Sequence, residues 1–131
     1  MRRDDWPERL DESITAARDR PFAWGEHDCV LFTASAVEAM TDVDHAAAWR
    51  GEYNSEMGAL RVLRKCGFAT TAEAAISIFG EAIALLLAQR GDVMLWRGAL
   101  GICTGTHAAF MTPEGLDFWP IADCDAAWRV D

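Results

Sequence analysis

The stretch Pro21-Phe22-Ala23-Trp24-Gly25-Glu26-His27-Asp28-Cys29 runs directly into an apolar segment that extends to Met40. The apolar side chains of that segment cover most of a helical circumference, which predicts a helix buried at the centre of the fold. Asp28 stands at its N-cap, where a carboxylate accepts a hydrogen bond from a free backbone N–H group. The sequence therefore places Cys29 in the first turn of a buried helix.

A cysteine at this end of a helix can be a nucleophile. The positive end of the helix dipole favours the thiolate, so the pKa of a thiol there can fall well below ~8.5. Papain-type nucleophiles are prepared in this way. The alternative interpretation is that Cys29 is only a small apolar residue of the buried helix.

One amphipathic helix precedes this stretch, and an irregular segment follows the central helix. Residues 9–18 carry three apolar side chains at helical spacing before Pro21, namely Leu10, Ile14 and Ala17. Between Thr41 and Asn54 the sequence predicts a loop that contains a brief helix at residues 46–49.

Two helices with clear capping residues come next. Ser55 caps the first, in which four residues recur at helical spacing before Gly67: Met57, Leu60, Leu63 and Cys66. Thr70-Thr71-Ala72-Glu73 is a capping box that opens the second, and this helix runs through Phe79 to Gly80. The first 90 residues are therefore predicted to be mostly helical.

From Gly91 the pattern changes to short strand-like runs separated by turns. The runs are Val93 to Trp96, Leu100 to Thr104, His107 to Met111 and Leu116 to Trp119. They predict an antiparallel meander. Helices followed by strands indicate an α+β domain, with N-terminal helices packed on a C-terminal antiparallel sheet.

Size and charge exclude several classes of protein. The 131 residues contain no repeat, low-complexity tract or linker, which predicts a single domain over residues 1–131. A net charge of −9 argues against nucleic acid as the ligand. The longest apolar run, Ala82 to Ala88, is too short to insert across a membrane. No export signal opens the sequence and its four cysteines have no close pairing, so we expect cytoplasmic synthesis and free thiols.

The motifs around Cys29 and Asp92 resemble those of the NlpC-type cell-wall cysteine peptidases. The similar features are Phe-x-Trp-Gly-x-x-Asp-Cys at residues 22–29, followed by an apolar helix, and Gly91-Asp92 before the first strand. This resemblance covers roughly residues 20–120. It implies a reduced papain-like α+β fold, and chemistry in which Cys29 attacks an amide of a peptidoglycan stem peptide through a thioester.

The chain looks still more like a set of poorly characterised, NlpC-like proteins of similar length that are encoded among phage and prophage tail genes. The similar segments are Arg20-Pro21-Phe22, Trp24-Gly25, Trp49-Arg50-Gly51-x-Tyr53 and Arg90-Gly91-Asp92. The resemblance implies a component of tail assembly or of the tail tip. Its partners would then be phage tail proteins or cell-wall peptide, and it would be associated with the virion.

The histidine of the NlpC-type pattern is missing from this sequence. Active enzymes begin the second strand with His-Val-Gly-Ile, whereas this chain has Ala99-Leu100-Gly101-Ile102. The third polar residue of the pattern falls within residues 110–112, where only Thr112 is polar. Proton transfer by a positioned base contributes about 10²–10⁴ in rate. The resemblance therefore implies a catalytically impaired pseudoenzyme.

Another histidine could replace the missing base. His107 begins the third predicted strand, and a Cys29–His107 pair would make the chain an active peptidase or amidase of peptidoglycan stem peptides. His27 is expected to face solvent, and His45 to be an exposed loop residue. Four residues have the chemistry of zinc ligands, but their spacing is not that of a zinc site, and we expect no metal or other cofactor. These four are His27, Cys29, Cys103 and His107.

Five residues near Cys29 are candidates for binding: Trp24, Gly25, Asp28, Trp49 and Tyr53. Trp24 and Trp49 flank the predicted cleft, and such aromatic side chains suit a peptide, a sugar-peptide chain or a protein interface. A small binding module with no link to phage tails is a further alternative.

Overall fold

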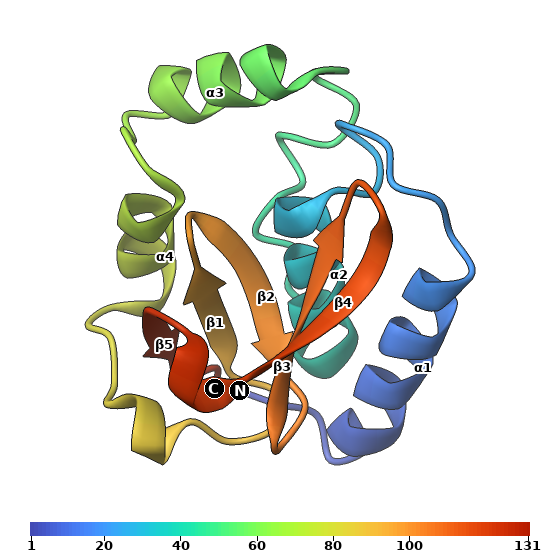
Figure 1. Cartoon of the computed structure of the whole chain (residues 1–131), viewed down its shortest axis with the longest axis vertical. Coiled ribbons are helices and arrows are strands. Elements are labelled where there is room, and N and C mark those ends of the chain that lie inside the picture. Colours follow the sequence, from blue (N-terminus) through green and yellow to red (C-terminus); the bar gives the residue numbers. More distant parts are fainter.

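Four α-helices precede the sheet, as the sequence predicts (Figure 1). In this computed structural model, which describes residues 1–131, they are α1 (Trp6–Arg18), α2 (Cys29–Thr41), α3 (Glu56–Lys65) and α4 (Thr71–Phe79). Helix α1 begins earlier than predicted because its first turn tolerates Pro7, whose missing N–H would have no partner there. None of the helices is both long and apolar enough to cross a membrane.

The predicted caps are confirmed. The Asp28 side chain accepts a hydrogen bond from the Leu31 N–H at the start of α2, and Ser55 accepts one from Gly58 at the start of α3. Thr70 and the Glu73 side chain form the capping box of α4. Each of these helices therefore begins at the residue that the sequence indicates.

The five strands form one antiparallel sheet in the order β4-β3-β2-β1-β5. Their bounds are β1 (Val93–Trp96), β2 (Ala99–Cys103), β3 (His107–Thr112), β4 (Gly115–Pro120) and β5 (Ala126–Trp128). The first four strands are the predicted meander. The short β5, which returns to pair with β1, is not predicted by the sequence analysis.

Helices α1 and α2 cover one face of this sheet (Figure 1). Side chains of α2 such as Phe32 and Val37 pack there against Leu100 and Ile102 of β2. The opposite face carries a smaller cluster that includes Cys103 and is covered by two 3₁₀ turns, η1 (Leu85–Leu87) and η2 (Ile121–Asp123). The predicted α+β class, with the helices packed on the sheet, is confirmed.

Asp92 ties both ends of the chain to the sheet. Its carboxylate is fully buried and accepts hydrogen bonds from four donors. The donors are the Arg2 and Arg129 guanidinium groups and the backbone N–H groups of Gln89 and Val130. The Arg90-Gly91-Asp92 motif is therefore a structural joint at which the first and last residues meet.

Two local expectations are wrong. Residues 46–49 form turns and no helix, and the Asp44 side chain accepts a hydrogen bond from the Ala46 N–H within them. His27 is 5% exposed and does not face solvent. Its ring packs edge-on against Phe32, and its Nε2 lies 3.4 Å from the Ala17 carbonyl oxygen, so it joins the chain before α2 to the end of α1.

Candidate functional site

Cys29 is the first residue of α2, at the positive end of the helix, as the sequence predicts. The residue before it, Asp28, is 1% exposed and organises the surrounding loops. One carboxylate oxygen accepts the Leu31 N–H at 3.0 Å. The other accepts the Gly25 N–H at 3.0 Å and the Tyr53 hydroxyl at 2.6 Å.

The Trp24-Gly25 turn and the segment 49–53 are one structural unit. Gly25 has a φ of +80°, and a Cβ atom added there would lie 1.8 Å from the Tyr53 carbonyl oxygen. The Gly51 N–H donates a hydrogen bond to the Gly25 carbonyl oxygen at 2.8 Å. Only glycine allows this approach, so both motifs are needed to build the wall beside Cys29.

A cleft with a volume of about 150 Å³ opens beside Cys29. Apolar side chains form most of its lining, and α3 forms one side of it. The lining residues are Trp24, Cys29, Val30, Trp49, Tyr53, Glu56, Ala59, Leu60, Leu63, Thr71 and Gly98. Of the five candidate binding residues, Trp24, Trp49 and Tyr53 thus line the cleft, while Gly25 and Asp28 lie behind it and contact Tyr53.

The thiol of Cys29 is held in its protonated form. Burial, followed by the negative charge of Asp28, raises the pKa of Cys29 to about 11. The backbone of Leu100 and the N–H groups at the start of α2 act in the opposite direction, but they do not outweigh burial. The expected lowering of this pKa by the helix terminus is therefore outweighed, because burial disfavours the thiolate and Asp28 places a second negative charge beside it.

His107 does not reach Cys29. In the β2–β3 pairing, Cys103 lies opposite Ala108, so His107 stands at the end of β2 that is farthest from Ala99. This is the end where Gly91 packs against Met40 in the last turn of α2. At ~3.3 Å per residue, the length of β3 separates it from the level of Cys29 by roughly 15 Å. The Cys29–His107 pair that the active-peptidase alternative requires is not formed in this structure, because the antiparallel register places its members at opposite ends of α2.

No other histidine lies beside Cys29 in place of His107. His27 is buried against α1, and His45 is exposed, as predicted, beside Phe79. Ala99, where the resemblance predicts a histidine in active enzymes, follows Gly98 of the cleft wall, and its methyl group packs with the cluster on the outer face of the sheet. Thr112, at the end of β3, donates its hydroxyl to the Gly115 carbonyl oxygen.

The residues considered as zinc ligands are not brought together. No group of three or more His, Cys, Asp or Glu side chains in the structure could hold a metal ion. The four cysteines are all free thiols, as predicted, and Cys66 is the exposed one. Its sulfur accepts a hydrogen bond from the Trp49 indole N–H at 3.2 Å.

The contact that Tyr53 makes was not predicted from the sequence. Its hydroxyl lies on Asp28, and burial and then this hydrogen bond raise the pKa of Tyr53 above its ordinary value. A tyrosine twenty-five residues after a capping aspartate gives no local signal, because the contact depends on how the loop returns to the helix. The Trp49-Arg50-Gly51-x-Tyr53 motif was the only indication that the two segments belong together.

Fold and site together define an α+β protein with a partly buried cysteine at a helix start and a mostly apolar cleft beside it that no histidine lines. The chain belongs to a family described as a domain of unknown function (DUF6950), whose match covers residues 1–130. A search of curated proteins finds no match to this chain.

Proposed function

We propose that this protein is a papain-like, NlpC-type domain that has lost its catalytic centre and serves as a component of a phage or prophage tail. The observation that carries the loss of catalysis is the surroundings of Cys29. Cys29 is the first residue of α2, where the resemblance predicts the nucleophile, yet no histidine lines the cleft. An uncharged thiol without an imidazole beside it has no partner that can take its proton and then protonate the departing amine, as the papain-type mechanism requires.

The arrangement of elements supports the finer fold assignment. A helix that begins with the cysteine packs against an antiparallel sheet, and the turn before β2 forms part of the cleft wall. The Trp24-Gly25 turn and the Gly91-Asp92 turn, which carry the resemblance, both occupy structural positions that other residues could not fill without strain. The proposed assembly role comes from the resemblance to proteins encoded among phage tail genes.

Comparison of the protein with its Cys29→Ala variant tests the loss of catalysis. We expect peptidoglycan stem peptides incubated with either protein to be recovered intact, because no histidine lines the cleft beside residue 29. The products are measured by mass spectrometry after prolonged incubation. Cleavage by the unaltered protein that disappears in Cys29→Ala would contradict the proposal and restore the peptidase interpretation.

The assembly role has its own test. Tail particles purified after induction of a strain that encodes this chain are digested and analysed by quantitative mass spectrometry. We expect peptides of this protein in the particles or in assembly intermediates that contain other tail proteins. Its complete recovery in fractions free of tail proteins would refute the assembly role, whatever the state of Cys29.

A further inference from the structure

The cleft beside Cys29, which we call the Cys29 cleft, combines an unpaired negative charge with three aromatic side chains. Glu56, the first residue of α3, is the only charged residue that lines it, and none of the salt bridges in the structure includes Glu56. The aromatic residues are Trp24, Trp49 and Tyr53, and all three are half-buried. A carboxylate and aromatic rings around one cleft are features that attract an organic cation.

The hydrogen-bond donors of the lining side chains are mostly used within the protein. The Tyr53 hydroxyl donates to Asp28, and the Thr71 hydroxyl donates to a backbone carbonyl oxygen at 2.7 Å. The Trp49 indole N–H donates to the Cys66 sulfur. These side chains therefore offer a ligand their ring faces and carbon atoms. A sugar, whose hydroxyl groups need several polar partners, fits such a cleft poorly.

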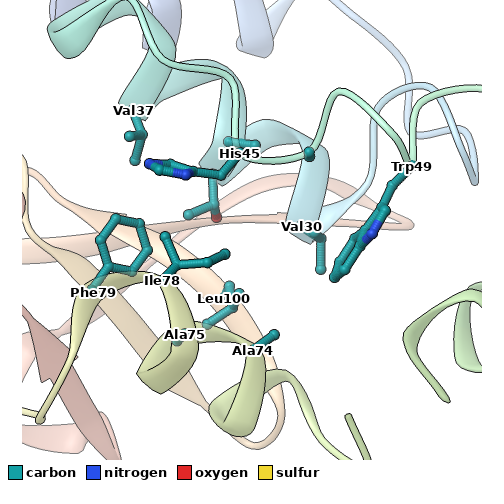
Figure 2. A pocket seen from close by; sticks show the side chains of 12 residues that line it. Val30, Val37, His45, Trp49, Ala74, Ala75, Ile78, Phe79 and Leu100 are labelled. Carbon is teal, nitrogen blue, oxygen red and sulfur yellow. The ribbon is translucent and has the colours of Figure 1, made fainter. Parts of the chain in front are cut away.

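The aromatic wall of the cleft is held in place by its neighbours. Figure 2 shows Trp49 beside Val30 at one end of the hollow between α2 and α4. The same two residues line the Cys29 cleft, so Trp49 belongs to the walls of both spaces. Trp24 packs against the Phe22 ring, which meets it edge-on with 5.0 Å between the ring centroids. A wall that is built before the ligand arrives lowers the cost of ordering it on binding.

The buried charge behind the cleft is also negative. Asp28 is 1% exposed, and none of the salt bridges includes it. As the N-cap of α2, its full negative charge outweighs the positive end of the helix, which is equivalent to about half a charge. Burial and, next, the charge of Asp28 raise the pKa of Cys29, and the second of these causes is a negative potential at the edge of the cleft.

No cationic side chain lines the cleft to oppose these charges. Arg50, in the loop beside it, is already held by the Asp44 carboxylate at 2.8 Å. The cations of α3 are at residues 61, 64 and 65. Arg61, the first of them, follows Glu56 by five residues, which places it about 7.5 Å further along the axis and on another face of the helix. An anionic ligand would therefore meet two carboxylates and no cationic partner.

We infer that the Cys29 cleft binds a quaternary ammonium group, held against the aromatic wall beside the Glu56 carboxylate. Such a group is attracted to ring faces and has no N–H to satisfy, whereas a primary ammonium is strongly hydrated and needs several acceptors. The cleft volume of about 150 Å³ suits one compact head group and lies below the roughly 300–1,000 Å³ of pockets for drug-sized ligands. The inference goes beyond the proposed function, because it depends neither on the loss of catalysis nor on the tail role.

Titrations of the full chain with three small probes test the charge and the methyl groups separately. Choline carries the quaternary ammonium, neohexanol is its uncharged analogue with carbon in place of nitrogen, and ethanolamine is its unmethylated analogue. Binding is followed by the indole N–H signals in NMR spectra, assigned with Trp24→Phe and Trp49→Phe. We expect choline to shift these signals to saturation and to bind about tenfold more tightly than either analogue.

The Glu56→Gln variant tests the carboxylate, since it removes the charge and keeps the shape. It should weaken choline binding about three- to fivefold and leave neohexanol binding unchanged. Glu52→Gln is the matched control, because Glu52 is also exposed and without a salt bridge but does not line the cleft. It should change the affinity by at most about twofold. Thermal unfolding verifies that both variants remain folded.

A fourth probe distinguishes the two sources of such a head group. Trimethyllysine, blocked at both its amino and carboxyl ends, carries the quaternary ammonium on a protein side chain, whereas choline carries it on a free small molecule. Tighter binding of blocked trimethyllysine supports the inference with a methylated protein as the ligand, and tighter binding of choline supports it with a small molecule.

Three outcomes would overturn the inference: no saturable shift with choline, an analogue that binds as tightly as choline, or equal weakening by Glu56→Gln and Glu52→Gln. Such results leave the hydrolysis and tail-particle tests unaffected, so they are distinguishable from failure of the proposed function.

Discussion

The Asp92→Asn variant should lose about 3–5 kcal/mol of its free energy of unfolding, because the substitution breaks a buried ion pair and leaves its partners unsatisfied. Both carboxylate oxygens of Asp92 accept two hydrogen bonds each. An amide of the same shape must turn its NH₂ group toward two donors and surrenders the charge that faces Arg2 and Arg129. Urea unfolding monitored by tryptophan fluorescence measures the loss.

Asp42→Asn is the matched control for this prediction. The Asp42 carboxylate also pairs with two arginines, Arg3 and Arg9, but its side chain is 53% exposed. Salt bridges in solvent contribute at most about 1 kcal/mol, so the control should remain close to the unaltered protein. Equal losses in the two variants would show that the joint at Asp92 does not hold the chain ends as described.

The Gly25→Ala variant should be destabilised by about 3 kcal/mol or more, because the new methyl group collides with backbone that has no free space to move into. The Cβ atom would lie 1.8 Å from the Tyr53 carbonyl oxygen. Relief of this collision requires segment 51–53 to retreat, which breaks the hydrogen bonds of Gly51 to Gly25 and of Tyr53 to Asp28. The same unfolding experiment measures the effect.

Gly51→Ala separates the collision from backbone strain. Gly51 has a similar φ of +76°, but nothing lies within 4 Å of an added Cβ atom. Only the cost of a left-handed conformation remains there, about 1–2 kcal/mol. If Gly25→Ala cost no more than Gly51→Ala, the close approach between the Trp24-Gly25 turn and Tyr53 would be wrong.

The local features of this fold were predictable because they depend on neighbouring residues. Asp28, Ser55 and Thr70 each cap the helix that follows them, and a capping side chain needs only the next three residues. The turns between the first four strands are equally local. Strand β5 was missed because three residues carry no measurable alternation, and its place is decided by its pairing with β1.

The candidate site was only partly predictable, because its chemistry depends on tertiary contacts. The sequence located Cys29 at the helix start, but the burial that raises its pKa comes from tertiary packing. His107 could serve as a base only if it lay at the end of the sheet beside the start of α2. Alternation of side chains predicts which face of the sheet a residue occupies, but not which end of a strand lies beside the start of a helix. His27 was misjudged for the same reason, since its burial comes from packing against α1.

The central claim, that Cys29 lies at a nucleophile's position without a base, is tested most directly by its rate of alkylation as a function of pH. The measurement uses a Cys66→Ala background, because Cys66 is the exposed thiol. The modified residue is identified by mass spectrometry, with and without the His107→Ala substitution. We predict a pKa of about 11 for Cys29, unchanged by His107→Ala. A pKa well below the ~8.5 of a free thiol that rises in His107→Ala would contradict the account, because it would reveal a thiolate–imidazolium pair.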